Sequence, residues 1–225
     1  MLSIILPTLN AEATLAATLD AILAPDVPNL DVVVVDGGST DATHAIATER
    51  GVRWVEGPPG RGCQLALGAS HARSEWLLFV HGDTTLPDDW PTVVSRFMVD
   101  DTNQQRAGYF ALAFDDASAG ARRVASLANW RAKAWGLPYG DQGLLIHRSL
   151  YDAVDGFAAH LNLMEDVEMA RRIGPMRLVR LPAHVTTSAA KYRAGGWWAR
   201  PLKNIACLGL YLLGAPLGWV ERLYR

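Results

Sequence analysis

Carboxylates that follow buried strands are the residues of this sequence best suited to chemistry. The run from Trp76 to Val80 is continuously apolar, which predicts a strand buried in a parallel sheet, and Asp83 comes shortly after it. Ligands bind beyond the carboxyl ends of such strands, and a carboxylate there suits a hard divalent cation that also contacts phosphates. Asp83 could instead only turn the chain ahead of Pro87, and this stretch alone favours neither interpretation.

A second polar corner follows an earlier strand. Residues 31–36 are four valines between two aspartates, which predicts another buried strand, and the glycine-rich residues 37–41 lead from it into a helix. This order places backbone N–H groups and a helix N-terminus beside Asp36, an arrangement that binds phosphate groups. We therefore expect a nucleotide-binding corner here.

The first strands should bring both corners to one edge of a sheet. Strands are expected at 3–7, 31–36, 52–55 and 76–80, with helices between them, the first of which Asn10 would cap. Because right-handed crossovers return each strand to the same side, the loops that carry Asp36 and Asp83 should face one cleft.

The second half of the chain continues the alternation less regularly. Helices are expected at 87–99, 118–135, from 164 to about 174, and at 202–213, and strands at 108–114, 144–147 and 176–181. The acids Glu165 and Asp166 open one of these helices, where they could simply oppose its positive end.

The composition is that of one large globular domain. Half of the 225 residues are apolar, and the net charge of −2 gives no reason to expect a nucleic-acid partner. The charge is unevenly distributed, because residues 171–225 carry ten of the 21 Lys and Arg but only one acid. An acidic body thus bears a basic tail.

The compartment and the tail can also be addressed from the sequence. Cys63 and Cys207 have no metal or redox spacing, and no basic leader precedes the first strand, so a cytoplasmic protein is expected. The longest apolar segment, 205–220, is shorter than the roughly 20 residues that span a bilayer. The tail could dock on the body, which its apolar circumference favours, or contact the inner face of a membrane or a second subunit.

Taken in order, these motifs resemble those of the family 2 glycosyltransferases, which have the GT-A fold. The matching segments are 3–10 (SIILPTLN), 34–41 (VVDGGSTD), 79–83 (FVHGD), 140–143 (GDQG) and 165–166 (ED), and the similarity covers essentially the whole chain. Gly60-Arg61-Gly62 before Gln64 and the Leu-Tyr-Arg ending resemble, more narrowly, the small bacterial arsenosugar-biosynthesis-type branch. The turn after Asp36 is the most specific of these signals.

The resemblance implies a fold and a role for each matched position. It implies a mixed, mainly parallel α/β sheet of GT-A type over residues 1–195, with a C-terminal helical tail over 196–225. It also implies a nucleotide-sugar donor, Mn²⁺ or Mg²⁺ at Asp83, and a general base at Asp166 beside Glu165. Donor contacts are implied for Pro7, Thr8, Asn10, Glu12, Asp36, Arg61, Gln64, His81, Gly82 and Lys191. In the segment from Gly140, Asp141 and Gln142 could contact the acceptor or the donor sugar, or they could simply form a turn between the flanking glycines.

Two positions depart from the family pattern. His81 stands where the first Asp of an Asp-x-Asp metal motif is common, so the metal site has one carboxylate fewer. Residues 189–192 replace an arginine-rich closing motif, which leaves Lys191 or Arg193 to close over the diphosphate.

These residues favour a metal-dependent inverting glycosyltransferase. The metal would stabilise the leaving diphosphate, and Asp166 would deprotonate an acceptor hydroxyl. Two other classes remain open: a nucleotide-binding or nucleotidyl-transferring protein with the same cleft, and a membrane-surface module built on the basic, Trp-rich tail.

Overall fold

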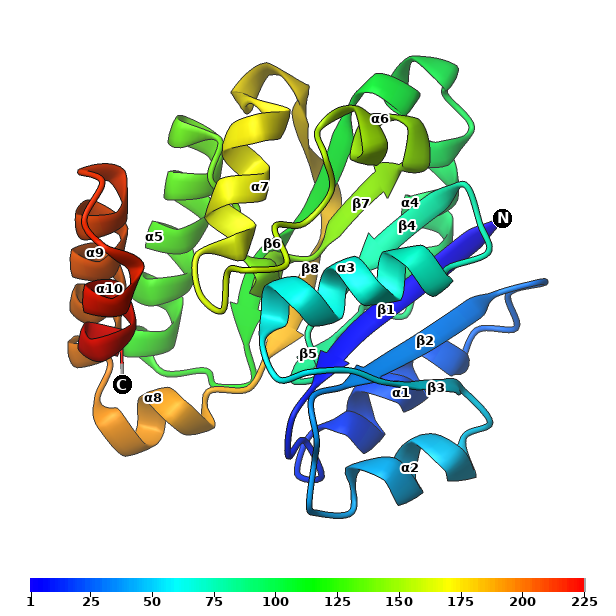
Figure 1. Cartoon of the computed structure of the whole chain (residues 1–225), viewed down its shortest axis with the longest axis horizontal. Coiled ribbons are helices and arrows are strands. Elements are labelled where there is room, and N and C mark those ends of the chain that lie inside the picture. Colours follow the sequence, from blue (N-terminus) through cyan, green and yellow to red (C-terminus); the bar gives the residue numbers. More distant parts are fainter. Residues whose placement is uncertain (225) are drawn as a thin grey trace.

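A twisted β-sheet crosses the centre of the molecule, and helices cover both of its faces (Figure 1). This computed structural model describes residues 1–224, apart from the side chains of residues 191, 194 and 195. Within the described residues the sheet has eight strands, in the spatial order β3 (Arg53–Glu56), β2 (Asp31–Asp36), β1 (Leu2–Thr8), β4 (Trp76–Phe79), β7 (Leu144–His147), β6 (Ala107–Phe114), β8 (Leu178–Thr187) and β5 (Thr84–Thr85).

The carboxyl ends of three parallel strands meet at one edge of this sheet. β1 pairs in parallel with β2, with Thr8 opposite Asp36, and with β4, with Ile5 opposite Phe79. The N–H of Val80 extends the second pairing by donating to the carbonyl of Ile5 at 3.0 Å. The loops that leave β1, β2 and β4 therefore start side by side.

The other half of the sheet is mixed. β7 runs antiparallel to both β4 and β6, β8 runs parallel to β6, and the short β5 pairs antiparallel with the end of β8. The expectation of a mixed, mainly parallel sheet flanked by helices is confirmed.

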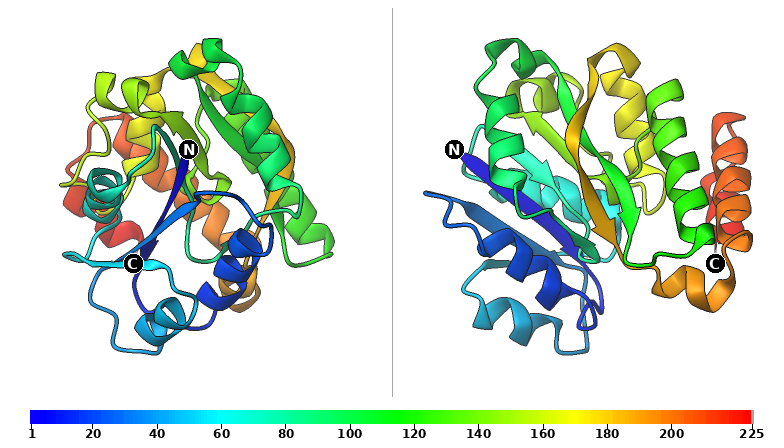
Figure 2. Two further views of the ribbon diagram at one scale, coloured as in Figure 1. Left: turned by 90° about the vertical axis from the view of Figure 1, so that its right-hand side faces the viewer. Right: turned by 180° about the vertical axis from the view of Figure 1, so that it is seen from behind.

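Two layers of helices bury the faces of the sheet (Figures 1 and 2). One face is covered by α1 (Leu15–Leu23), α2 (Thr43–Glu49) and α4 (Trp90–Met98), and the other by α3 (Arg61–His71), α6 (Arg148–Ala153) and α7 (Glu165–Ile173). α4 shows why these segments form helices, since its buried side chains have the i, i+3, i+4, i+7 spacing of one helix face: Trp90, Val93, Val94 and Phe97.

The remaining helices lie beside β6 or connect strands. α5 (Ala119–Trp135) packs on β6, and its end is set by Gly136, whose φ of 62° lies in the left-handed region that favours glycine. Three short 3-10 segments are η1 (Asp101–Gln105), η2 (Gly140–Gln142) and η3 (Pro175–Arg177).

The C-terminal residues form a helical hairpin next to α7. After α8 (Ala190–Gly195), α9 (Ala199–Leu212) and α10 (Leu217–Tyr224) pack against each other; we call α9 and α10 the C-terminal hairpin. Its buried side chains share an apolar cluster with α7 and with the turn before it: Leu137, Leu163, Met164, Val167, Ala170, Cys207, Leu208 and Val220. None of the helices among residues 1–224 is long and apolar enough to cross a membrane.

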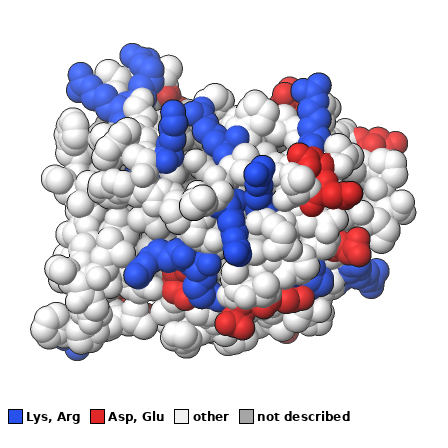
Figure 3. Space-filling model, turned by 90° about the horizontal axis from the view of Figure 1, so that it is seen from above, with Lys and Arg blue, Asp and Glu red and all other residues white. Residues whose placement is uncertain are grey.

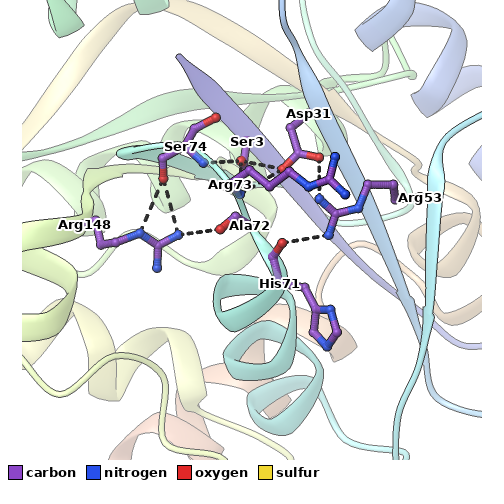
Figure 4. A network of polar contacts seen from close by, with 8 residues as sticks. All are labelled: Ser3, Asp31, Arg53, His71, Ala72, Arg73, Ser74 and Arg148. Atoms are coloured by element: carbon purple, nitrogen blue, oxygen red, sulfur yellow. Dashed lines mark hydrogen bonds and ion pairs between the residues drawn. The ribbon is translucent and has the colours of Figure 1, made fainter.

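A polar network ties together the opposite edge of the sheet, where β1 and β2 begin (Figure 4). The Ser3 hydroxyl donates to Asp31 Oδ2 at 2.7 Å, and Arg53 Nη1 lies 2.8 Å from Asp31 Oδ1. Arg148 donates to the carbonyls of Ala69 and Ala72, which are exposed at the end of α3. These charges stabilise the scaffold at the end of the sheet remote from the loops that follow Thr8 and Asp36.

Three expectations about individual helices and strands were wrong. Asn10 does not cap the first helix, because it lies in the left-handed region at φ 50° and its Oδ1 accepts a hydrogen bond from Thr40 N. The helix expected from residue 87 begins at Trp90. The last strand runs to Thr187 instead of ending at 181, because an irregular register opposite β6 accommodates the proline at 182.

Candidate active site

The carboxylate of Asp36 fixes the glycine-rich turn that follows β2. It is 3% exposed, and its Oδ2 accepts from the N–H groups of Gly38 and Ser39 at 2.9 and 2.6 Å. Its Oδ1 accepts from the hydroxyls of Thr8 and Ser39 at 3.0 and 2.5 Å. Four donors from the protein thus hold this carboxylate, so its first role is to shape the corner.

The loop after β1 is joined to that turn by hydrogen bonds between exposed residues. Asn10 N donates to Ser39 Oγ at 2.7 Å, and Glu12 Oε2 accepts from Ala42 N at 3.1 Å. Thr8 is buried at the base of this loop. The two loops therefore form one polar wall at the carboxyl ends of β1 and β2, where a nucleotide was expected.

Gln64 and Gln142, expected at ligand contacts, instead use their amides inside the protein. Gln64 is 3% exposed, and its Nε2 donates to the carbonyls of Thr8 and Val35 at 2.7 and 2.8 Å. Gln142 is fully buried; its Nε2 donates to the carbonyl of Phe110 at 3.1 Å, and its Oε1 accepts from Tyr139 N at 3.3 Å. Both amides therefore support the site from inside the protein rather than face a ligand. A buried main-chain carbonyl without a hydrogen bond would destabilise the fold, and these amides supply that bond.

The loop after β4 lies between β1 and η2. The carbonyl of Gly82 accepts from the hydroxyls of Thr14 and Thr18, and a Cβ on Gly82 would lie 3.3 Å from the Thr8 side chain. On the other side, a Cβ on Gly140 would lie 2.3 Å from Nε2 of His81. A larger residue at position 140 would require the His81 ring to move, which is consistent with the glycine that precedes Asp141.

Asp141 places a poorly compensated carboxylate beside this loop. Its Oδ1 is shielded from solvent and has no hydrogen-bond partner within residues 1–224. Burial raises the pKa of Asp141 to about 6, Arg131 opposes that shift, and the negative charges of Asp166 and Asp83 add to it. Three carboxylates from β4, η2 and α7 therefore lie within electrostatic reach of one another.

Glu165 and Asp166 form the first turn of α7. The side chain of Glu165 is fully buried, with Oε1 3.4 Å from Arg61 Nη1, and its Oε2 accepts no hydrogen bond from the described part of the chain. Burial and the neighbouring Asp166 raise the pKa of Glu165 to about 7, although Arg61 lowers it. Asp166 is held differently, because its Oδ2 accepts from Gly140 N at 2.7 Å. This bond joins the expected base to η2.

A pocket opens between these groups. Its polar lining includes His81, Glu165 and Asp166. Apolar residues form the rest of its wall: Leu65, Phe79, Pro138, Leu144, Phe157, Met169 and Ala170. An apolar pocket with a few convergent polar groups is the usual form of a small-molecule site.

Arg131 is a site residue that the sequence did not single out. Its guanidinium lies 3.3 Å from the centroid of the Tyr139 ring, and its Nη2 donates to Gln142 Oε1 at 3.4 Å. Arg131 lies on the same face of α5 as the buried Val124 and Ala128, because the three positions have helical spacing. A charged residue on this inward face was the feature of the sequence that could have identified it.

A divalent cation would fit this arrangement only if protein carboxylates and substrate phosphates coordinated it together. Among residues 1–224, no group of three or more His, Cys, Asp or Glu side chains could enclose a metal ion. Asp83 and the incompletely bonded Asp141 nevertheless supply oxygen ligands of the kind that Mg²⁺ and Mn²⁺ prefer, and such ions often take their other ligands from substrate phosphates. The side chain of Lys191, expected at the diphosphate, lies outside the described residues.

The buried Glu165 predicts a pH dependence of stability. Its pKa is raised in the folded state, so the folded protein binds more protons than the unfolded chain between pH 4.5 and about 7. The free energy of unfolding should therefore fall as pH rises through that window, by about 3 kcal/mol at most. Thermal unfolding followed by circular dichroism from pH 5 to 8 would measure this fall.

The matched variants for that experiment are Glu165→Gln and Glu49→Gln. Glu165→Gln should flatten the dependence, because an amide does not titrate. Glu49 is exposed on α2, so its replacement should reproduce the wild-type curve. Equal slopes for the wild type and Glu165→Gln would contradict the assignment.

Comparisons with known proteins agree with this geometry. Residues 3–154 match the model of the family described as Glycosyl transferase family 2. A segment of 93 residues is 39% identical to a "PGL/p-HBAD biosynthesis glycosyltransferase" of Mycobacterium bovis and covers 38% of this chain and 36% of that relative. The match thus spans about a third of the relative's length. The "Putative glycosyltransferase EpsE" of Bacillus subtilis is 25% identical over 179 residues, 74% of this chain and 64% of its own.

Solved structures show the same fold at low sequence identity. The mannosyltransferase PcManGT from Pyrobaculum calidifontis, solved with GDP-Man and Mn²⁺, superposes with a TM-score of 0.70 at 20% identity, covering 99% of this chain and 68% of that one. S. aureus TarS 1-349 gives a TM-score of 0.68 at 18% identity, covering 99% of this chain and 69% of that one. The expected GT-A architecture is confirmed. Since the family model matches more than half of its residues, the chain belongs to glycosyl transferase family 2.

Proposed function

We propose that this protein is a metal-dependent inverting glycosyltransferase that moves a sugar from a nucleotide-diphosphate donor to an acceptor hydroxyl. The observation that carries the proposal is the gathering of Asp83 and Asp166 within electrostatic reach of Asp141, with Asp166 lining the pocket. Neighbours of this fold have been solved with nucleotide-sugar donors, GDP-Man in PcManGT and UDP-GlcNAc in TarS. Family membership and fold support the reaction class, and the carboxylates support its chemistry.

The nucleotide occupies the corner between the loops after β1 and β2. Pro7, Thr8 and Asp36 shape its floor, while Asn10 and Glu12 lie on the exposed rim. Asp83 would hold Mn²⁺ or Mg²⁺ together with the diphosphate, and Arg61 and Lys191 would contribute positive charge. When bound, the metal neutralises negative charge that develops on the leaving diphosphate.

Asp166 acts as the general base toward the acceptor hydroxyl. Its Oδ2 is oriented by the N–H of Gly140, and its side chain lines the pocket. Removal of the hydroxyl proton allows attack on the anomeric carbon from the face opposite the diphosphate, so the configuration inverts. The shielded Oδ1 of Asp141 is suited to accept a hydrogen bond from a sugar hydroxyl.

Product analysis tests the proposal directly. The purified protein should bind one of a panel of nucleotide sugars in the presence of Mn²⁺, seen as a rise in unfolding temperature. With an acceptor it should release free nucleoside diphosphate. Release of pyrophosphate instead would support the alternative, a nucleotidyl-transferring protein with the same cleft.

The C-terminal hairpin favours an additional contact with an anionic membrane surface. Its outward side exposes large apolar side chains, including Leu202 at 61%, Ile205 at 62% and Leu213 at 86%. α5 lies next to α9 and adds the exposed pair Trp130 and Trp135 (Figures 1 and 2). From above, the end of the molecule where α9 lies is largely free of charged side chains, and Lys and Arg lie beside it (Figure 3). Apolar residues next to basic ones are typical of interfacial binding.

Vesicle flotation tests this contact with matched variants. The wild type should float with vesicles containing phosphatidylglycerol and less with neutral vesicles, because the basic residues add attraction. A Leu202→Gln, Ile205→Gln double variant should weaken binding about tenfold or more, since each buried apolar side chain contributes about 1.5–3 kcal/mol. Met176→Gln, which changes a 95% exposed residue on η3, is the control.

Two outcomes would overturn the membrane contact. One is equal flotation of the double variant and the control. The other is a wild type that does not float but sediments as a dimer, which would make the hairpin a subunit interface.

A further inference from the structure

The turn that precedes the Glu165–Asp166 pair is strained. Met164 has a φ of 64°, in the left-handed region that a non-glycine residue seldom adopts. Such a residue persists only where its surroundings hold it in place. Met164 is 6% exposed and packs in the cluster that contains Cys207, Leu208 and Val220 of the C-terminal hairpin. The hairpin therefore contributes to holding the backbone from which the pair projects.

A polar chain connects the same hairpin to Glu165. Arg200 Nη2 donates to the Tyr224 hydroxyl at 3.3 Å, and the Tyr224 side chain lies within electrostatic reach of Arg61. Arg61 Nη1 lies 3.4 Å from Glu165 Oε1. A second link joins the loop before α7 to α10, because Asn162 Nδ2 donates to Glu221 Oε1 at 3.4 Å.

Arg61 is the cation that compensates the buried charge of Glu165. Glu165 is fully buried and Arg61 is 35% exposed, so Arg61 has room to move away unless something orients it. Tyr224 is a phenol at the end of α10; its hydroxyl accepts a hydrogen bond from Arg200 of α9 and lies within electrostatic reach of Arg61 of α3. Its hydroxyl is placed to fix the direction in which the Arg61 guanidinium points.

We propose that the C-terminal hairpin is a positioning element for the Glu165–Asp166 pair, and that Tyr224 is its positioning residue, acting on Glu165 through Arg61. This inference rests on the proposed function for its role in turnover. Without the Tyr224 hydroxyl, Arg61 stabilises the Glu165 carboxylate less well, and the pair holds a proton to higher pH.

The groups that set this titration come from every element around Glu165. The charged side chains that act on Glu165 are Arg61 of α3 and Asp166 of α7. His81 and Tyr139 line the same pocket, and Arg200 and Tyr224 of the hairpin lie on the far side of Arg61. Tyr224→Phe changes one hydroxyl of this set and preserves the aromatic ring.

The first test compares Tyr224→Phe with Trp219→Phe. Trp219 lies on the same helix and is 61% exposed, so it is the matched control. In Tyr224→Phe, kcat should fall about tenfold, because losing one hydrogen bond to a charged group costs about that factor. KM for the donor should stay within about twofold of the wild-type value. The acid limb of the kcat profile should move to higher pH. An unchanged kcat and pH profile would overturn the inference.

A double-mutant cycle gives the second test. If Tyr224 acts through the charge of Glu165, Tyr224→Phe should have no further effect on residual turnover in a Glu165→Gln background. Additive losses would show that Tyr224 acts by another route and would overturn the inference.

Thermal unfolding tests the same coupling without turnover. The fall of the unfolding temperature between pH 5 and 8 should be steeper in Tyr224→Phe than in the wild type or Trp219→Phe, because the pKa of Glu165 rises further. Equal slopes would contradict the coupling. A wild type that turns over no nucleotide sugar would refute the proposed function, while the unfolding slopes would still decide this inference.

Discussion

Asp166→Asn is expected to lower sugar transfer by about 10²- to 10⁴-fold, the contribution of a positioned general base. The asparagine keeps an oxygen that can accept from Gly140 N, a bond of 2.7 Å in the structure, so the η2 segment should stay in place. It cannot take a proton from the acceptor hydroxyl. Release of nucleoside diphosphate measures the rate, and calorimetry with the nucleotide should show affinity close to that of the wild type.

The matched control for this variant is Asp152→Asn. Asp152 is exposed on α6 and lies outside the pocket, so the same chemical change there should leave turnover unaltered. Normal turnover by Asp166→Asn would remove Asp166 from the mechanism, and equal losses in both variants would point to a general effect on folding.

Asp83→Ala is expected to remove most of the metal-dependent part of donor binding. Asp83 is the carboxylate that the loop after β4 brings within electrostatic reach of Asp141, and no triad of His, Cys, Asp or Glu ligands among residues 1–224 can replace it. The affinity for nucleoside diphosphate in Mn²⁺ or Mg²⁺ should fall about a hundredfold, or about 3 kcal/mol. Calorimetry with and without the metal separates this loss from metal-independent nucleotide binding.

Asp88→Ala provides the control in the same loop region. Asp88 is exposed ahead of α4, and its replacement should leave the metal dependence as in the wild type. If Asp83→Ala retained full metal-dependent affinity, the metal would have to be held elsewhere, and the assignment of Asp83 as its ligand would be wrong.

The two glutamines show where sequence-based assignment of the site stops. Gln64 and Gln142 lie in segments that resemble family motifs, and ligand contacts were the natural expectation. In the folded protein each amide satisfies main-chain carbonyls beneath the site. Their value is to hold β1, β2 and β6 in register with the loops that do face the pocket. A motif therefore marks a region important to the site without saying which way each side chain points.

Local patterns in the amino-acid sequence were sufficient to predict most strands, most helices and the segments that carry Asp36, Asp83 and Asp166. Apolar periodicity and turn residues act within a few positions of each other, so they can be detected without the fold. The order of these patterns along the chain also predicted the mainly parallel sheet and produced the family resemblance.

Only the tertiary structure decided how the site is assembled. Arg61 and Glu165 are 104 positions apart, and their pairing depends on α3 and α7 packing on the same face of the sheet. The packing of the C-terminal hairpin on the turn before Glu165 has the same origin. Burial, the raised pKa of Glu165 and the crowding of three carboxylates are properties of contacts between distant segments, and no local pattern of residues encodes them.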